Sequence, residues 1–224
     1  MPVIEQARPA PFPFEASSTA LVVIDPQVDF MERGGWADAM GLDVEALAPV
    51  TPVIAALLKA FRRAGMTVIF TREGYRSDLA DLPEAKRARR APRVGDQGAR
   101  GRYMVVGEPC NAIIPELAPI EGEPVVDKPG AGAFYATLFG QILRLKGITH
   151  LIVTGVTTDV CVNATIREAN DRGYQCLLVE DATASYNAAF TDAIIAMLRT
   201  GIAGATAQSG EVLSAVEAMA AAPR

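Results

Sequence analysis

The feature that most constrains the fold is the alternation of short apolar segments with longer segments of helical periodicity. Five β-branched, apolar runs are typical of buried parallel strands, at 19–25, 66–72, 123–129, 149–155 and 174–181. Apolar residues at helical spacing predict four helices, each closed by a glycine, at 44–65, 136–147, 159–173 and 187–201. Residues 202–219 add a last short strand and a terminal helix.

This order of elements predicts an α/β fold. Strands that alternate with helices are joined by right-handed crossovers, which give a parallel sheet with helices on both faces. The chain has 224 residues and is 50% hydrophobic, enough for one compact domain. We expect that domain to span 19–224, preceded by an extended, proline-rich arm over 1–18.

Composition excludes several classes of partner. The formal net charge of −5 gives no reason to expect nucleic acid. We found no signal-peptide pattern and no apolar run of membrane-spanning length, so we expect a soluble, cytoplasmic protein without a membrane partner. The basic run 84–93 lies in the irregular segment 73–123; it is either a solvated face or a surface for an acidic partner.

Three chemically reactive residues follow three of the expected strands. Asp25 ends the first strand, Lys128 the third, and Cys161 begins the helix after the fourth. In a parallel sheet, ligands bind outside the carboxyl ends of the strands. We therefore expect an acid, an ammonium group and a thiol to meet at one edge of the sheet.

That combination suits nucleophilic catalysis by a thiol. Thr157 or Thr158 could cap the helix, and the positive helix N-terminus together with Lys128 would favour a thiolate at Cys161. Asp25 could accept the thiol proton and later donate it to a leaving amine. Each residue also has a structural interpretation, as a small core residue, a turn former or a surface lysine. Cys110 and Cys176 are expected to be incidental thiols.

Three stretches resemble one enzyme family. VVIDPQVDF, DKPGAGAFYAT and GVTTDVCVNATIREANDRGYQCLLVEDATAS are similar to the isochorismatase-like cysteine hydrolases, in the correct order over about 18–205. The resemblance implies a Rossmann-like three-layer fold with a six-stranded, mostly parallel sheet. It implies a catalytic triad of Asp25, Lys128 and Cys161. It also implies a cis peptide at Val156–Thr157, which presents a backbone N–H to an oxyanion.

The resemblance also favours some reactions of the family over others. Nicotinamidases of this family hold a metal with Asp and two His, whereas this chain has only His150, so we expect neither a metal nor another cofactor. Isochorismatases cleave a vinyl ether and need no thiol, so Cys161 favours an amidase. The chain looks most like the biuret and ureide hydrolases. As aligned, however, Gly201 replaces a glutamine that contacts substrate in biuret hydrolases.

The expected reaction is hydrolysis of a small ureide or N-carbamoyl amide through a thioester on Cys161. Candidate substrate-binding residues follow the second and fifth strands: Arg72, Glu73, Tyr75, Tyr186 and Asn187. Three alternatives stay open: an isochorismatase-type ether hydrolase, a catalytically idle binding protein on the same fold, and a redox thiol protein. The resemblance also implies a homo-oligomer, a dimer or a tetramer.

Overall fold

A computed structural model of the chain describes residues 1–88 and 93–221. Among these residues, the main sheet has six strands, and every neighbouring pair is parallel. Their spatial order is β10 (Ala205–Ala207), β9 (Gln175–Ala184), β8 (His150–Val156), β3 (Thr19–Ile24), β4 (Thr67–Glu73) and β7 (Val125–Lys128). The α/β prediction is confirmed, and the sheet is parallel throughout rather than mostly so.

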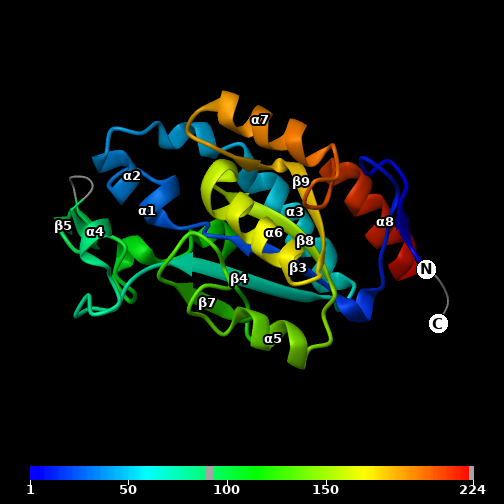
Figure 1. Ribbon diagram of the computed structural model, residues 1–224, viewed down its shortest axis with the longest axis horizontal. Helices are drawn as coiled ribbons and strands as arrows, with labels where there is room; N and C mark the ends of the chain where they lie inside the picture. Colours follow the sequence, from blue (N-terminus) through cyan, green and yellow to red (C-terminus); the bar gives the residue numbers. More distant parts are fainter. Residues whose placement is uncertain (89–92, 222–224) are drawn as a thin grey trace.

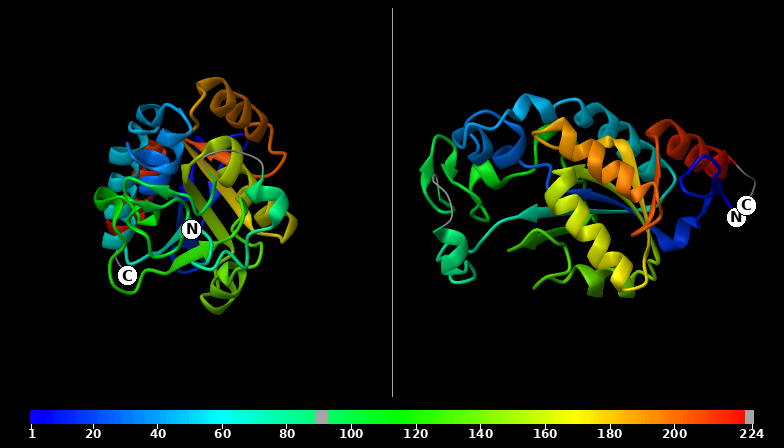
Figure 2. Two further views of the ribbon diagram at one scale, coloured as in Figure 1. Left: turned by 90° about the vertical axis from the view of Figure 1, so that its left-hand side faces the viewer. Right: turned by 45° about the horizontal axis from the view of Figure 1, so that its top comes forward.

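Helices cover both faces of the sheet, as the end-on view in Figure 2 shows. One face carries α3 (Val50–Arg63) and α8 (Ser209–Ala221). The other carries α5 (Phe139–Leu145), α6 (Asn163–Asp171) and α7 (Ala188–Leu198). The central strand β3 is buried at every residue, because its alternate side chains enter two separate apolar cores.

The expected helix over 44–65 is divided in two. A short 3-10 turn, η2 (Val44–Leu47), precedes α3, and Asp43 caps η2 by accepting the N–H of Glu45. The prolines at 49 and 52 fall just before and within the first turn of α3, where a missing N–H costs least. The apolar stripe of α3 is buried through Val50, Ile54, Leu57, Leu58 and Phe61.

The segment Val44–Arg63 also has the length and composition of a membrane-spanning helix. We expected no such segment from the sequence. In the structure it is interrupted between η2 and α3, and its apolar stripe packs against the sheet in the domain core. We therefore assign this segment to the core of the fold.

The N-terminal segment folds back onto the domain instead of extending away from it. Residues 3–4 (β1, Val3–Ile4) pair with β2 (Phe12–Pro13), and the 3-10 turn η1 (Ala16–Ser18) leads into β3. Phe14 is fully buried, and Arg8 forms a β-bridge with Thr206. We propose that 1–18 belongs to the same structural unit as the rest of the chain.

Irregular segments gather at the carboxyl end of the sheet, at the left of Figure 1. They carry short elements only, namely α1 (Val28–Met31), α2 (Trp36–Ala39), α4 (Glu84–Arg87), β5 (Gln97–Gly98), β6 (Gly101–Arg102) and η3 (Pro109–Asn111). The 3-10 turn η4 (Pro115–Leu117) packs along α3 on the way to β7. The basic run 84–93 falls partly on α4, and its residues 89–92 lie outside the described ranges. Within α4, Lys86 turns inward and donates to the Tyr75 hydroxyl and to the carbonyl of Pro129.

Candidate active site

The structure brings Asp25, Lys128 and Cys161 together at the carboxyl end of the sheet. Asp25 follows β3, Lys128 ends β7, and Cys161 lies in the π-helical turn η5 (Thr158–Val162) that follows β8. Lys128 Nζ is 2.7 Å from Asp25 Oδ2, and both side chains are fully buried. Parallel strands place their carboxyl ends at one edge, so residues up to 136 positions apart in sequence become neighbours.

Glu73 completes the cluster. Cys161 Sγ donates a hydrogen bond to Glu73 Oε2 at 3.2 Å, and the same oxygen is 3.5 Å from Lys128 Nζ. One carboxylate oxygen of Asp25, one of Glu73 and the sulfur of Cys161 all lie within 4.8 Å of one another. Glu73 reaches this position because β4 pairs with β7 in a register that sets it beside Lys128.

The backbone of Glu73 is held by two amide side chains. Gln27 donates to its carbonyl at 3.0 Å and accepts its N–H at 2.7 Å. Asn111 donates to the same carbonyl at 2.8 Å. Both amides are fully buried, so they fix the end of β4 relative to the loops around it.

Asp25 adopts a backbone conformation that few non-glycine residues take, with φ of 47°. Thr71 Oγ1 donates to Asp25 Oδ1 at 2.6 Å, and the Asp25 N–H donates to the Thr71 carbonyl at 3.2 Å. Lys128 Nζ also donates to the carbonyl of Gly130 at 2.9 Å. These contacts hold the carboxylate against Lys128, which explains how the left-handed conformation is maintained.

Burial dominates the electrostatics of the cluster. It raises the pKa of Asp25, although the Lys128 charge opposes the shift. Burial disfavours the charged form of Lys128 as well, but the neighbouring acids outweigh it and raise the pKa of its ammonium group. The pKa of Cys161 is raised by burial and by the charges of Asp25 and Glu73, against the opposing effect of Lys128. These effects oppose the thiolate expected from the helix N-terminus and Lys128, and they favour a protonated thiol at Cys161.

The turn that carries Cys161 begins where the sequence predicts, but neither of the two threonines predicted to cap it does so. The peptide Val156–Thr157 is cis, and Thr157 is the residue that precedes η5. The Thr157 side chain makes no capping hydrogen bond, and the Thr158 hydroxyl pairs with Thr183 of β9 at 2.8 Å. Cys161 still lies in the first turn, and η5 continues into α6.

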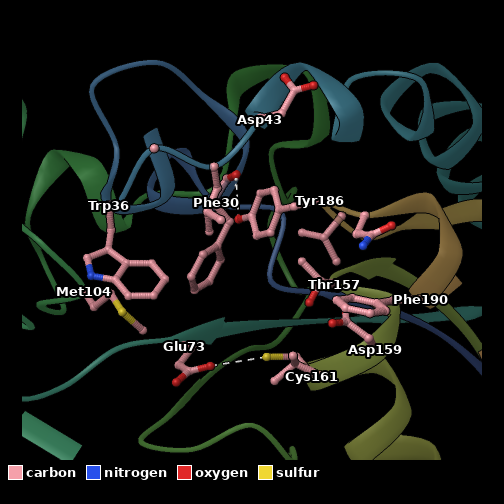
Figure 3. Close-up of a pocket in the computed structure, with 15 residues that line it drawn as sticks. Phe30, Trp36, Asp43, Glu73, Met104, Thr157, Asp159, Cys161, Tyr186 and Phe190 are labelled. Carbon is pink, nitrogen blue, oxygen red and sulfur yellow. Dashed lines mark hydrogen bonds between the residues drawn. The ribbon is translucent and has the colours of Figure 1, made fainter. Parts of the chain in front are cut away.

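A cavity of about 550 Å³ opens onto this cluster (Figure 3). Glu73 and Cys161 form its floor, and Val156, Thr157, Tyr186 and Asn187 belong to its wall. Asp25 and Lys128 lie behind this floor, fully buried. The rest of the lining comes from loops and helix ends, namely Phe30, Trp36, Gly41, Leu42, Asp43, Met104, Asp159, Val160 and Phe190.

Two of the five predicted substrate-binding residues do not line the cavity. Arg72 points away from Glu73, because successive strand residues face opposite sides of the sheet, and it pairs with Asp127 at 2.7 Å. Tyr75 is buried beneath the site, where its hydroxyl accepts a hydrogen bond from Lys86. We therefore leave both residues out of the proposed binding site.

Gly201 lies far from the cavity. It follows α7, which returns from the carboxyl end of β9 to the amino end of β10, so Gly201 is at the opposite edge of the sheet from Cys161. Its nearest contact for an added side chain is Pro9. The argument against biuret from Gly201 is therefore wrong, because this position does not face a substrate at Cys161.

Asp25, Glu73 and Cys161 are the group of described residues whose spacing could suit a metal ion. Lys128 already sets a positive charge 2.7 Å from Asp25 and 3.5 Å from Glu73. His150 begins β8 and so lies at the amino edge of the sheet, away from this group. The arrangement fits an acid–base and thiol cluster neutralised by an ammonium group.

Sequence reasoning missed most of the cavity wall. Trp36 and Met104 lie in irregular segments whose elements are too short to show periodicity, and no motif singled them out, whereas Phe30 ends the quoted stretch VVIDPQVDF. Asp29 could have been identified from the sequence, because it lies in the quoted stretch VVIDPQVDF. It is fully buried, and its carboxylate accepts the N–H groups of Trp36 at 3.2 Å and Met104 at 2.8 Å. It thus ties two walls of the cavity together.

Comparison with known proteins identifies the family and agrees with the fold. The family model described as the isochorismatase domain matches residues 19–212. Ureidoacrylate amidohydrolase RutB of Yersinia enterocolitica is 35% identical over 192 residues, which are 81% of this chain and 81% of that protein. The solved cysteine hydrolase of Pseudomonas syringae pv. phaseolicola has a TM-score of 0.81 at 27% identity, covering 92% of this chain and 96% of that one.

A second solved structure carries the name of an amidase. N-carbamoylsarcosine amidase from Thermoplasma acidophilum has a TM-score of 0.63 at 25% identity, covering 86% of this chain and 96% of that one. The resemblance drawn from the three sequence stretches is confirmed by the family model and by these relatives. This chain belongs to the isochorismatase family and is a hydrolase similar to the amidohydrolases of that family.

Proposed function

We propose that this chain is a cysteine-dependent amidohydrolase that cleaves a C–N bond of a small ureide or N-carbamoyl amide. The observation that carries the proposal is the position of Cys161. Its sulfur lies at the floor of a cavity, with two carboxylates and an ammonium group around it. This cluster supplies a nucleophile, a base and the charge that holds the base in place.

In the proposed first step, Asp25 accepts the thiol proton as the sulfur attacks the carbonyl carbon of the substrate. The C–S bond forms, the carbonyl π electrons move to oxygen, and the N–H groups of Thr157 and Cys161 hold that oxyanion. Asp25 then returns the proton to the departing nitrogen, the C–N bond breaks, and a thioester remains on Cys161. One well-placed oxyanion donor is worth about 3–4 kcal/mol in such steps.

The second step mirrors the first. Asp25 takes a proton from water, whose oxygen attacks the thioester carbon. The C–S bond then breaks, the acid product leaves, and the proton returns to sulfur. Lys128 keeps Asp25 in place throughout, and Glu73 orients the thiol at the floor of the cavity. These roles need no group beyond the side chains of this cluster and water.

An ammonia-release screen tests the proposal directly. The panel contains biuret, triuret, ureidoacrylate, N-carbamoyl amino acids and nicotinamide. We expect turnover of at least one ureide or N-carbamoyl compound, abolished in Cys161→Ala. Cys176→Ala is the matched control, because this second buried cysteine lies in β9 away from the cavity. Ammonia release that survives Cys161→Ala contradicts the proposal.

Two further expectations belong to the same proposal. We infer a homo-oligomer and a cytoplasmic location, the latter supported by three free, buried cysteines. The segment 73–123 and the terminal helix α8 are the proposed contact surfaces. Sedimentation velocity of the purified chain tests the first expectation, since a single species of monomer mass contradicts it.

A further inference from the structure

The charge on the cavity wall has one sign. Asp43, Glu73 and Asp159 are acidic, and among the described residues that line the cavity none is lysine, arginine or histidine. Lys128 does not change this balance at the wall. It is fully buried behind the floor, and its ammonium group lies between the carboxylates of Asp25 and Glu73.

The carboxylates of Asp43 and Asp159 accept hydrogen bonds from uncharged groups, which leave their negative charge in place. Ser185 Oγ donates to Asp159 at 2.6 Å, and the Glu45 N–H donates to Asp43 at 3.2 Å. Within residues 1–88 and 93–221, neither Asp43 nor Asp159 forms an ion pair. Asp159 is half-buried, so its negative charge acts on whatever occupies the cavity. Asp43 is exposed and its carboxylate points away from Cys161 in Figure 3, so solvent screens its effect and makes it weaker.

The remainder of the wall is apolar and aromatic. Phe30 and Trp36 meet edge to face with ring centroids 6.3 Å apart. Figure 3 shows the Trp36 and Phe190 side chains on opposite sides of the space above Cys161. A volume of about 550 Å³ is typical of pockets that bury a drug-sized ligand, so a molecule as small as biuret fills only part of it.

We propose that the substrate is an uncharged or cationic amide or ureide with an apolar body, and that the cavity selects against carboxylates. This inference rests on the proposed function and specifies its substrate. Carboxylates are usually recognised by arginine or lysine, whereas aromatic faces attract apolar groups and cations. Ureidoacrylate and N-carbamoylsarcosine, after which two relatives are named, both carry a carboxylate.

A matched set of substrates isolates the effect of charge. Benzylurea, para-carboxybenzylurea and para-aminomethylbenzylurea share the same ureide and ring and differ in one remote substituent. We expect kcat/KM for the neutral and the cationic compound to exceed that for the carboxylate by about tenfold or more. Turnover that depends on Cys161 but favours the carboxylate, or treats all three alike, overturns the inference and leaves the proposed function standing.

Binding to Cys161→Ala by calorimetry gives a second readout that does not need turnover. We expect the dissociation constants to rank in the same direction, again by about tenfold. Equal affinities, tighter binding of the carboxylate, or no binding of any of the three compounds overturns the inference. Loss of ammonia release from every ureide tried, together with tight binding of benzylurea, counts against the proposed function alone.

Variants that remove one wall charge test whether these charges cause the preference against the carboxylate. Asp159→Asn should narrow the preference against the carboxylate at least about threefold by removing the half-buried wall charge, and Asp43→Asn should narrow it less because that charge is exposed. Asp78→Asn is the control, because Asp78 is an exposed carboxylate paired with Arg76 and does not line the cavity. A preference that stays unchanged in both wall variants, or that narrows equally in Asp78→Asn, contradicts the assignment.

Discussion

Glu73 accepts a hydrogen bond from Cys161 at 3.2 Å at the floor of the cavity. This contact and the raised pKa of Cys161 both favour a resting thiol, and the same carboxylate oxygen contacts Lys128 at 3.5 Å. Deprotonation must accompany attack on a bound substrate instead of preceding it. A buried acid of raised pKa, Asp25, is then suited to take the proton at that moment.

The resting thiol predicts slow alkylation at neutral pH. Burial, together with the charges of Asp25 and Glu73, raises the pKa of Cys161. In a chain that lacks Cys110 and Cys176, labelling by iodoacetamide should therefore rise about tenfold per pH unit between about pH 7 and pH 9. Intact-protein mass spectrometry follows the rate.

Glu73→Gln tests whether the neighbouring charge sets this dependence of the labelling rate on pH. Removing the Glu73 charge stabilises the thiolate, so labelling near pH 7 should become faster while keeping its upward slope with pH. Fast labelling of the unaltered site that does not change between about pH 6 and pH 8 would show a preformed thiolate.

Lys128→Met should destabilise the fold strongly. It leaves the buried Asp25 carboxylate without its cation, a loss typically worth about 3–5 kcal/mol. Lys128 opposes the rise that burial causes in the pKa of Asp25, so without Lys128 the fold tolerates Asp25 best when its carboxyl is protonated. The loss of folding free energy should therefore become smaller as the pH is lowered towards 3.8, the ordinary pKa of an aspartate side chain, because Asp25 is then protonated.

Urea unfolding of three variants measures this effect. Lys146→Met makes the same change at an exposed position and should stay within about 0.5 kcal/mol of the parent. The double variant Lys128→Met/Asp25→Asn removes both charges and should recover part of the loss. A single Lys128→Met variant as stable as the Lys146→Met control would mean that the pair is not buried as described.

Asp25→Asn should separate folding from turnover. Asparagine tolerates the left-handed conformation that Asp25 adopts, so circular dichroism should show a native fold. Its amide cannot accept and return a proton, and kcat should fall at least about a thousandfold. Asp171→Asn, at an exposed position of α6, controls for the substitution itself. A variant that keeps more than about a tenth of the activity would remove Asp25 from the reaction.

Asp29→Asn should affect substrate binding more than chemistry. The N–H groups of Trp36 and Met104 bind different oxygens of the Asp29 carboxylate, and asparagine replaces one of these oxygens by an NH2 group that cannot accept. The unpaired N–H loosens two walls of the cavity, so we expect KM to rise roughly tenfold with kcat changed by less than about threefold. A fall in kcat at constant KM would place Asp29 in the chemistry instead of in the wall.

The sequence predicted the parts of this structure that depend on pattern and order. Alternating apolar and helical segments specify a parallel sheet, and the ends of its strands must share one edge. The sequence alone therefore predicts that Asp25, Lys128 and Cys161 lie together. It does not predict their distances, because the β4–β7 register that sets Glu73 beside Lys128 has no local signal.

The state of the thiol and the shape of the cavity required the structure. The helix N-terminus and Lys128 both favour a thiolate at Cys161, but burial beside two acids acts in the opposite direction and raises its pKa. Phe30, Trp36 and Met104 reach the cavity through loops whose paths depend on contacts such as those of Asp29. The predicted helix over 44–65 failed at its start because two prolines there allowed a separate 3-10 turn.

The most direct test of the account is to trap the intermediate. The unaltered protein is mixed with a ureide that it turns over, quenched in acid within milliseconds, and digested for peptide mass spectrometry. We predict a mass increase equal to the acyl group, confined to the peptide that contains Cys161 and absent from Cys161→Ala. Steady turnover with no adduct on that peptide, and undiminished in Cys161→Ala, would contradict nucleophilic attack by this sulfur.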